Sequence, residues 1–193
     1  MAKPHTPLVT GIYTADPSAH VFDGRIYIYP SHDLGNDKED DGSGDHFWME
    51  DYHVFSLESL DAEAVDEGEA LHIKDVPWAR EQMWAPDAAT KNGKYYFYFP
   101  AKDQDGVFRI GAAVGDSPAG PFTPEADYIA GSFSIDPAVF VDDDGRPICT
   151  SVACGAASSR SGRPASSCPT PPPAPERTAP RATSPRSCPS RPS

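Results

Sequence analysis

The stretch "ADPSAHVFDGRIYIYPSHD" (15–33) contains the pattern that decides the fold. An Asp-Pro pair is followed by small and apolar residues, then by Asp-Gly, and then by the alternating aromatic run "RIYIYP". Asp-Gly between apolar runs predicts a β-hairpin, because both central residues of a type I′ turn need positive φ. The aromatic run is rich in β-forming residues and long enough for about five to seven residues of sheet. The stretch therefore predicts an antiparallel hairpin.

The same pattern returns twice along the chain. It appears as "APDAATKNGKYYFYFPAKD" (85–103) and as "IDPAVFVDDDGRP" (135–147). The turn glycines of the three units are Gly24, Gly93 and Gly145, separated by 69 and 52 residues. Repeats of this size, each built on antiparallel hairpins, are typical of the blades of a β-propeller.

The segments between the repeats supply further strands. Residues 46–59 and 108–117 are expected to form the outer strands of the first two blades, and residues 59–71 are the one helix candidate. A β-sandwich is the structural alternative, but it would not repeat Asp-Pro at the same place in each unit. We expect an all-β fold, with residues 1–148 forming about two propeller blades and the start of a third.

Two acidic residues occupy the same point of two repeats, namely Asp16 and Asp136. The innermost strands of a propeller converge on its axis, so equivalent residues at the heads of those strands gather at one mouth of the channel. Two carboxylates across such a funnel suit glycoside hydrolysis, in which one group activates water and another protonates the leaving oxygen. Alternatively, Asp before Pro merely initiates a turn. The residues alone leave both interpretations open.

The charge of the chain limits the kinds of partner. Its formal net charge is −13, and the basic residues after position 149 make the front part more acidic still. This argues against a nucleic acid or an anionic membrane, both of which need a cationic surface, and favours a neutral, hydroxyl-rich substrate. No apolar run approaches the length of about eighteen residues needed to cross a bilayer. Residues 1–11 lack the features of a secretory signal, so a soluble cytoplasmic protein is expected.

Three stretches together carry a resemblance to a known family. They are "YTADPSAHVFDGRIYIYPSHD" (13–33), "MWAPDAATKNGKYYFYFPA" (83–101) and "SIDPAVFVDDDG" (134–145). In this order they resemble the opening motifs of the family 43 glycoside hydrolases, five-bladed propellers that act as β-xylosidases and α-L-arabinofuranosidases. The resemblance covers about residues 8–148. It implies inverting, exo-acting hydrolysis of xylo- or arabino-oligosaccharides derived from xylan or arabinoxylan. In inverting enzymes the two catalytic carboxyl groups lie about 6.5–9.5 Å apart, with water between them.

The resemblance also implies catalytic roles. Asp16 matches the general base that activates water, and Asp136 matches the residue that orients the general acid and tunes its pKa. The general acid of the family is a Glu, typically before Gly-Pro, on a blade downstream of the Asp136 motif. The only later Glu in this chain is Glu176, in "APERTAP", which matches nothing. The catalytic set is therefore incomplete, and we expect this chain to be inactive.

Further site residues follow from the same resemblance. Trp84 and Ala85 match the apolar wall of the subsite that holds the reacting sugar, and His32 and Asp33 are expected near it. No residue is assigned to a metal, and no cofactor is required. Some family members hold a calcium ion in the channel. The acidic segment 33–45 lacks the residue order of a calcium loop, so it is expected to be a solvated surface loop.

The last part of the chain, residues 149–193, differs in composition. It is rich in Pro, Ser and Arg, contains all four cysteines and has no aromatic residue, and we expect it to be disordered. One explanation is a frameshift after codon 147, because permitted codons for "ICTSVACGAASSRSG" (148–162) encode "LYFGGLWGGQLEKW" when read two bases further on. A natural disordered linker is the alternative. With little of a third blade, the apolar face of the second, including residues of "KYYFYF", is expected to meet water.

Two functional interpretations from different classes remain. The first is a glycosidase, and the second is a non-catalytic carbohydrate-binding propeller module that uses the same face. A basic Pro-rich tail that docks onto acidic partners is a third, weaker interpretation. The sequence leaves open the choice between xylose and arabinose, and the oligomeric state.

Overall fold

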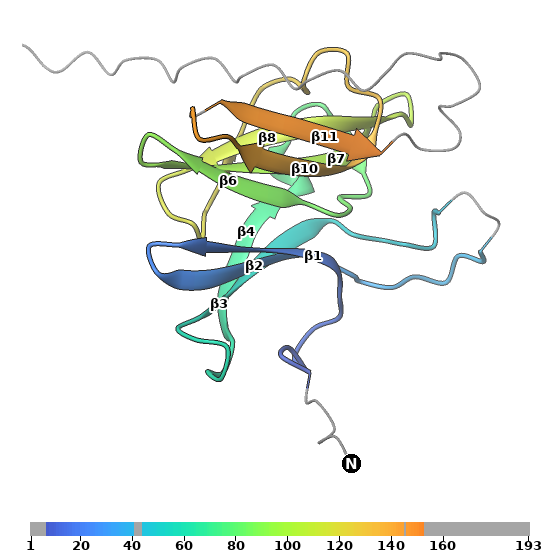
Figure 1. The fold of residues 1–193 in the computed structure, drawn as a ribbon. Helices are drawn as coiled ribbons and strands as arrows, with labels where there is room; N and C mark the ends of the chain where they lie inside the picture. The colour runs from blue at the N-terminus through green and yellow to red at the C-terminus, as the bar shows by residue number, and fades with distance from the viewer. Residues whose placement is uncertain (1–6, 41–43, 145, 153–193) are drawn as a thin grey trace, which may run out of the picture.

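The computed structural model describes residues 7–40, 44–144 and 146–152. These residues form three antiparallel sheets that follow one another along the chain and lie one beside the next (Figure 1). This confirms the expected all-β fold of two blades and the start of a third. Among the described residues, no helix is both long enough and apolar enough to cross a membrane.

The first sheet contains four strands in chain order. They are β1 (Thr14–Phe22), β2 (Arg25–His32), β3 (Asp51–Leu57) and β4 (Val65–His72). At the turn between β1 and β2, Asp23 has φ 52° and Gly24 has φ 79°. Both central residues thus have the positive φ that the sequence predicted for a type I′ turn.

The second sheet repeats this arrangement and adds an edge strand. After the short 3₁₀ helix η1 (Ile73–Asp75) come β5 (Ala79–Glu81), β6 (Asp87–Lys91), β7 (Lys94–Asp103), β8 (Phe108–Gly115) and β9 (Thr123–Pro124). The spatial order is β5-β7-β8-β9, and β6 pairs with β7. Asn92 and Gly93 have φ 53° and 71°, so this turn also has the predicted form.

The third sheet is the hairpin of β10 (Ile135–Val141) and β11 (Pro147–Val152). Its predicted turn glycine, Gly145, lies outside the described residues. The expected start of the disordered tail at residue 149 is wrong, because residues 149–152 belong to β11 and pair with β10. The apolar or β-branched residues Ile148, Thr150 and Val152 alternate along this strand, which suits a hairpin. The rest of the expected disordered tail, 153–193, lies outside the described residues.

The one helix candidate, residues 59–71, does not form a helix. Residues 59–62 form a turn, in which the backbone N–H of Ala62 donates to the carbonyl of Ser59 at 3.1 Å, and the strand β4 begins at Val65. The strand is acidic because it lies at the edge of the first sheet, where side chains reach solvent and charge discourages pairing with other chains.

Two apolar cores hold the three sheets together. The larger core lies between the first and second sheets and includes Tyr29, Tyr52 and Phe97, each with no exposed surface. The smaller lies between the second and third sheets, where Tyr98 packs against Val139 and Val141. Tyr98 is only 3% exposed, so the third sheet shields this part of "KYYFYF", contrary to the expected exposure.

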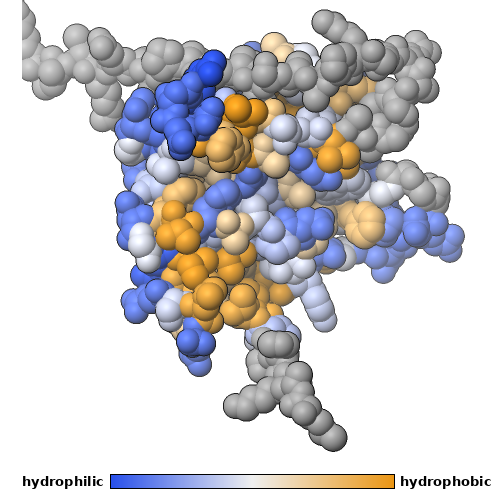
Figure 2. Space-filling model, viewed as in Figure 1, coloured by the Kyte–Doolittle hydropathy of each residue, from blue (hydrophilic) through white to orange (hydrophobic). Residues whose placement is uncertain are grey.

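The outer faces of the first and third sheets remain apolar in places. Val21 on β1 is 67% exposed, and Phe140 on β10 is 61% exposed beside its partner Ile148 on β11. Figure 2 shows apolar side chains gathered over the β1–β2 hairpin and β3. A closed propeller places a neighbouring blade against such faces.

Candidate active site

Asp16 in the first sheet and Asp136 in the third sheet occupy equivalent and unusual backbone positions. Asp16 lies where the β1–β2 register shifts, between Ala15 and Ser18, and Asp136 lies at the matching shift between Ile135 and Ala138. Their φ angles are 48° and 50°, in the left-handed region that costs a residue with a Cβ about 1–2 kcal/mol. A bulge redirects a side chain out of the regular pleat, and such bulges occur next to active sites. Two acids in the same strained geometry indicate a function beyond turn formation.

The two carboxylates also interact electrostatically. Burial raises the pKa of Asp136, and the negative charge of Asp16 raises it further. Asp136 is half-buried and Asp16 is exposed. The fold therefore brings together two acids that lie 120 residues apart in the chain, as the repeat predicted. Paired carboxylates of unlike environment are what general acid–base chemistry on a glycosidic bond requires.

A third carboxylate, Asp87, joins all three sheets. It lies at the start of β6 and is 6% exposed. One oxygen is 2.6 Å from His20 Nε2 on β1, and the other accepts the backbone N–H of Val139 on β10 at 2.6 Å. Burial disfavours the charged form of Asp87, but hydrogen bonds from His20, Val139 and Ala88 outweigh burial and lower its pKa. Asp87 thus fixes the strands that carry Asp16 and Asp136 relative to each other.

Asp87 has no role in the sequence interpretation, although a signal was present. It is the acid of the second repeat, in "APDAA", where the other two repeats have Asp before Pro. In this repeat Pro comes before Asp, and the pairing of β6 with β7 has no register shift from its first pair, Asp87–Tyr98, onward. The side chain of Asp87 lies in the interface between the sheets, where it contacts His20 and Val139.

Trp84 and Ala85 lie just before β6 and are partly exposed. The indole of Trp84 packs on Phe108 with ring centroids 4.4 Å apart, and its Nε1–H donates to the carbonyl of Phe47 at 3.2 Å. The carbonyl of Trp84 accepts the buried hydroxyl of Tyr52 at 2.6 Å. These contacts fix the backbone and ring of Trp84 on the structured core, as a rigid apolar wall requires.

His32 is the last residue of β2, and Asp33 follows it directly. The Nδ1 atom of His32 lies 2.7 Å from the Oδ1 atom of Asp51 on β3, so its side chain is directed to that strand. The backbone N–H of Asp33 donates to the carbonyl of Tyr13 at 3.0 Å, and its carboxylate accepts the N–H of Gly35 at 3.1 Å. Asp33 therefore tethers the segment before β1. The expected proximity of both residues to a sugar subsite stays a prediction.

The sequence model of glycosyl hydrolases family 43 matches residues 6–152. The chain belongs to family 43. Among its curated relatives, Xylosidase/arabinosidase 43A of Humicola insolens is 64% identical over 141 residues, and a Xylosidase/arabinosidase of Bacteroides ovatus is 55% identical over 139 residues. Each alignment covers 72% of this chain and 43% of the relative. The chain thus spans less than half the length of these family 43 relatives.

Solved structures of family 43 share the fold. The β-xylosidase/α-arabinofuranosidase CoXyl43, from a compost microbial metagenome, was crystallised with xylotriose in a calcium-free form. It is 64% identical and superposes with a TM-score of 0.73, covering 75% of this chain and 44% of that one. A GH43_1 enzyme from Xanthomonas citri, in complex with xylose, is 56% identical with a TM-score of 0.73, covering 82% and 45% of the two chains.

The described residues contain one candidate group of side chains for a metal ion. Within them, the one group of three His, Asp or Glu side chains close enough to share a metal ion is His32, Asp51 and His53. Ca²⁺ takes six to eight oxygen ligands, whereas this group offers two imidazoles and one carboxylate. This group therefore does not match calcium, and the channel calcium ion known from some family members stays untested for this chain.

Proposed function

We propose that the full-length protein is an inverting, exo-acting glycosidase that releases xylose or arabinose from oligosaccharides of xylan or arabinoxylan. The observation that carries the proposal is the pair of acids Asp16 and Asp136. They lie at matching register shifts of two blades, and the charge of Asp16 helps to raise the pKa of Asp136. Family membership and relatives named xylosidase/arabinosidase support it. So does the xylotriose bound to a structural neighbour.

The two carboxylates take different parts in the proposed reaction. Asp16, exposed at the head of β1, acts as the general base and takes a proton from the water that attacks the anomeric carbon. Asp136 orients the Glu that protonates the leaving oxygen, and it raises the pKa of that Glu by like-charge repulsion. Inversion follows because water attacks from the face opposite the leaving group in one displacement.

The remaining residues are proposed to shape the sugar subsite. Trp84 and Ala85 form its apolar wall, for which the packing of Trp84 on Phe108 provides rigidity. His32 and Asp33 lie close to the subsite and position its edge. A wall that holds its shape without substrate loses little side-chain entropy when the sugar binds.

The 193-residue chain is itself proposed to be inactive. Its one Glu after Asp136 is Glu176, which matches no family motif, so the leaving oxygen has no proton donor. Frame restoration after codon 147 is proposed to return the missing blades.

The test uses the full-length protein encoded by the frame-restored gene. It should hydrolyse an aryl β-xyloside or an aryl α-L-arabinofuranoside, and NMR of the first product should show the inverted anomer. The 193-residue chain serves as the control and should hydrolyse neither. A full-length protein that binds xylo-oligosaccharides but hydrolyses neither substrate would instead support a non-catalytic binding module.

A further inference from the structure

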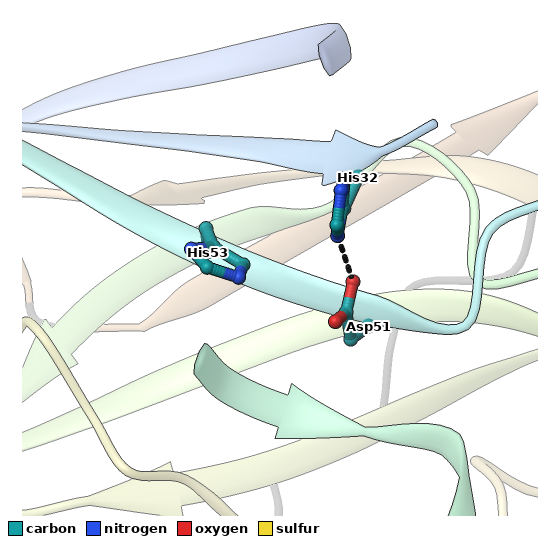
Figure 3. Close-up of side chains that lie close together, drawn as sticks. All are labelled: His32, Asp51 and His53. Carbon is teal, nitrogen blue, oxygen red and sulfur yellow. Dashed lines mark hydrogen bonds and ion pairs between the residues drawn. The ribbon is translucent and has the colours of Figure 1, made fainter. Parts of the chain in front are cut away.

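Three side chains with metal-binding atoms gather on the first sheet. They are His32 on β2 and Asp51 and His53 on β3 (Figure 3). Asp51 and His53 are two residues apart in a strand, so they project from the same face. The register Ser31–Tyr52 sets His32 directly across from Asp51. The possible ligand atoms of all three lie within 4.8 Å of one another.

This face is separate from the core. Tyr52, which lies between Asp51 and His53 on β3, is fully buried against the second sheet. Its neighbours therefore face away from that core. The side chains of His32, Asp51 and His53 are 17%, 13% and 19% exposed, respectively. In the part of the chain that the structure describes, each of the three side chains keeps some surface open to solvent, while most of it is covered by surrounding protein.

We propose that His32, Asp51 and His53 bind a divalent first-row transition metal ion such as Zn²⁺, with water as the fourth ligand. Two imidazole nitrogens and one carboxylate oxygen suit such ions. Bonds of about 2.0–2.1 Å place tetrahedral ligand atoms about 3.3 Å apart. The side chains therefore need to move by no more than about 1.5 Å, which rotation about their χ angles allows.

The surrounding contacts prepare both histidines for this role. The carboxylate of Asp66 lies 3.0 and 3.2 Å from Nδ1 of His53, so Nδ1 carries the proton and Nε2 is left as the ligand. A carboxylate behind a histidine in this way is the usual outer shell of a metal site. At His32 the metal would replace the contact between Nδ1 and Asp51 Oδ1, which spans 2.7 Å, and the single ring proton of the neutral imidazole would then lie on Nε2.

The first measurement is titration of the 193-residue chain with Zn²⁺ against a chromophoric chelator. Cys154, Cys168 and Cys188 are replaced by Ser so that their thiols do not compete. We expect one Zn²⁺ per chain, tighter binding at pH 7.5 than at pH 5.5 because His must be neutral, and no displacement by excess Ca²⁺. Co²⁺ should give the visible absorption of a four-coordinate nitrogen and oxygen site. Failure to bind one ion would overturn the proposal.

Variants then locate the ion. His53→Asn and Asp51→Asn should each weaken Zn²⁺ binding at least about thirty-fold, and Asp66→Asn, which acts through His53, about ten- to a hundred-fold. His46→Asn, which changes a histidine in the loop between β2 and β3, should leave the Zn²⁺ affinity within about two-fold. Far-UV circular dichroism checks that each variant is folded, and His53→Gln provides a second, longer polar replacement. Equal affinity of parent and His53 variants, or an equal loss with His46→Asn, would overturn the assignment.

Discussion

Replacement of Asp87 by Asn tests whether one buried carboxylate holds the three sheets in place. The carboxylate accepts from the backbone N–H of Val139 and lies 2.6 Å from the ring nitrogen of His20. An amide oxygen can replace one of these contacts but carries no charge. A hydrogen bond to a charged group contributes about 1.5–3 kcal/mol, and we expect Asp87→Asn to lower the free energy of unfolding by about this amount. We expect a loss near the lower end of this range, because burial already disfavours the charged form of Asp87.

The assay is equilibrium urea unfolding of the 193-residue chain, followed by tryptophan fluorescence. Because the folded-state pKa of Asp87 is lowered, its contribution is present above the unfolded pKa of about 4 and is lost as pH falls through the folded value. The difference between parent and variant should therefore shrink below pH 4. The control is Asp116→Asn, since the Asp116 carboxylate is 86% exposed in its surface pair with Lys94. A loss under about 0.5 kcal/mol at pH 7, no larger than the control, would mean that Asp87 does not hold the sheets together.

Three further outcomes are expected. Because the pKa of Asp136 is raised in the folded state, its ionised form destabilises the fold. This cost is absent below the unfolded pKa of about 4 and appears as pH rises toward the folded pKa. In thermal melts, Asp136→Asn should therefore stabilise the chain at pH 7 but not at pH 3. Gly111→Ala should cost about 1–3 kcal/mol in urea unfolding, because a Cβ there would lie 2.6 Å from the rings of Phe99 and Trp78, whereas Gly11→Ala, with nothing within 4 Å, should be neutral. Sequencing of the source DNA around codon 147 should reveal a lost base; an intact frame encoding the tail in independent isolates would contradict the frameshift.

The hairpins could be predicted because their determinants are local. Asp23-Gly24 and Asn92-Gly93 dictate positive φ at adjacent residues, and both turns form as expected. The repeat of Asp-Pro also predicted that Asp16 and Asp136 approach each other. The bulges that redirect these side chains could not be predicted, because a bulge depends on how two strands pair and not on either strand alone.

The histidine cluster shows a different limit. Period-two alternation sets Asp51 and His53 on one face of β3 from the sequence alone. The position of His32 opposite Asp51 depends on the β2–β3 register, and a connection of eighteen residues leaves that register open. Strand β11 was missed because the composition of the whole tail concealed the alternation of Ile148, Thr150 and Val152.

The role of Asp16 as general base is tested most simply by the turnover of the full-length, frame-restored protein with Asp16 replaced by Asn. The amide preserves the shape of the carboxylate but cannot accept a proton from the attacking water. We expect kcat on the better aryl glycoside to fall about 10²–10⁴-fold, while binding of xylo-oligosaccharide changes much less. A variant that keeps half of the parent kcat would show that Asp16 is not the general base.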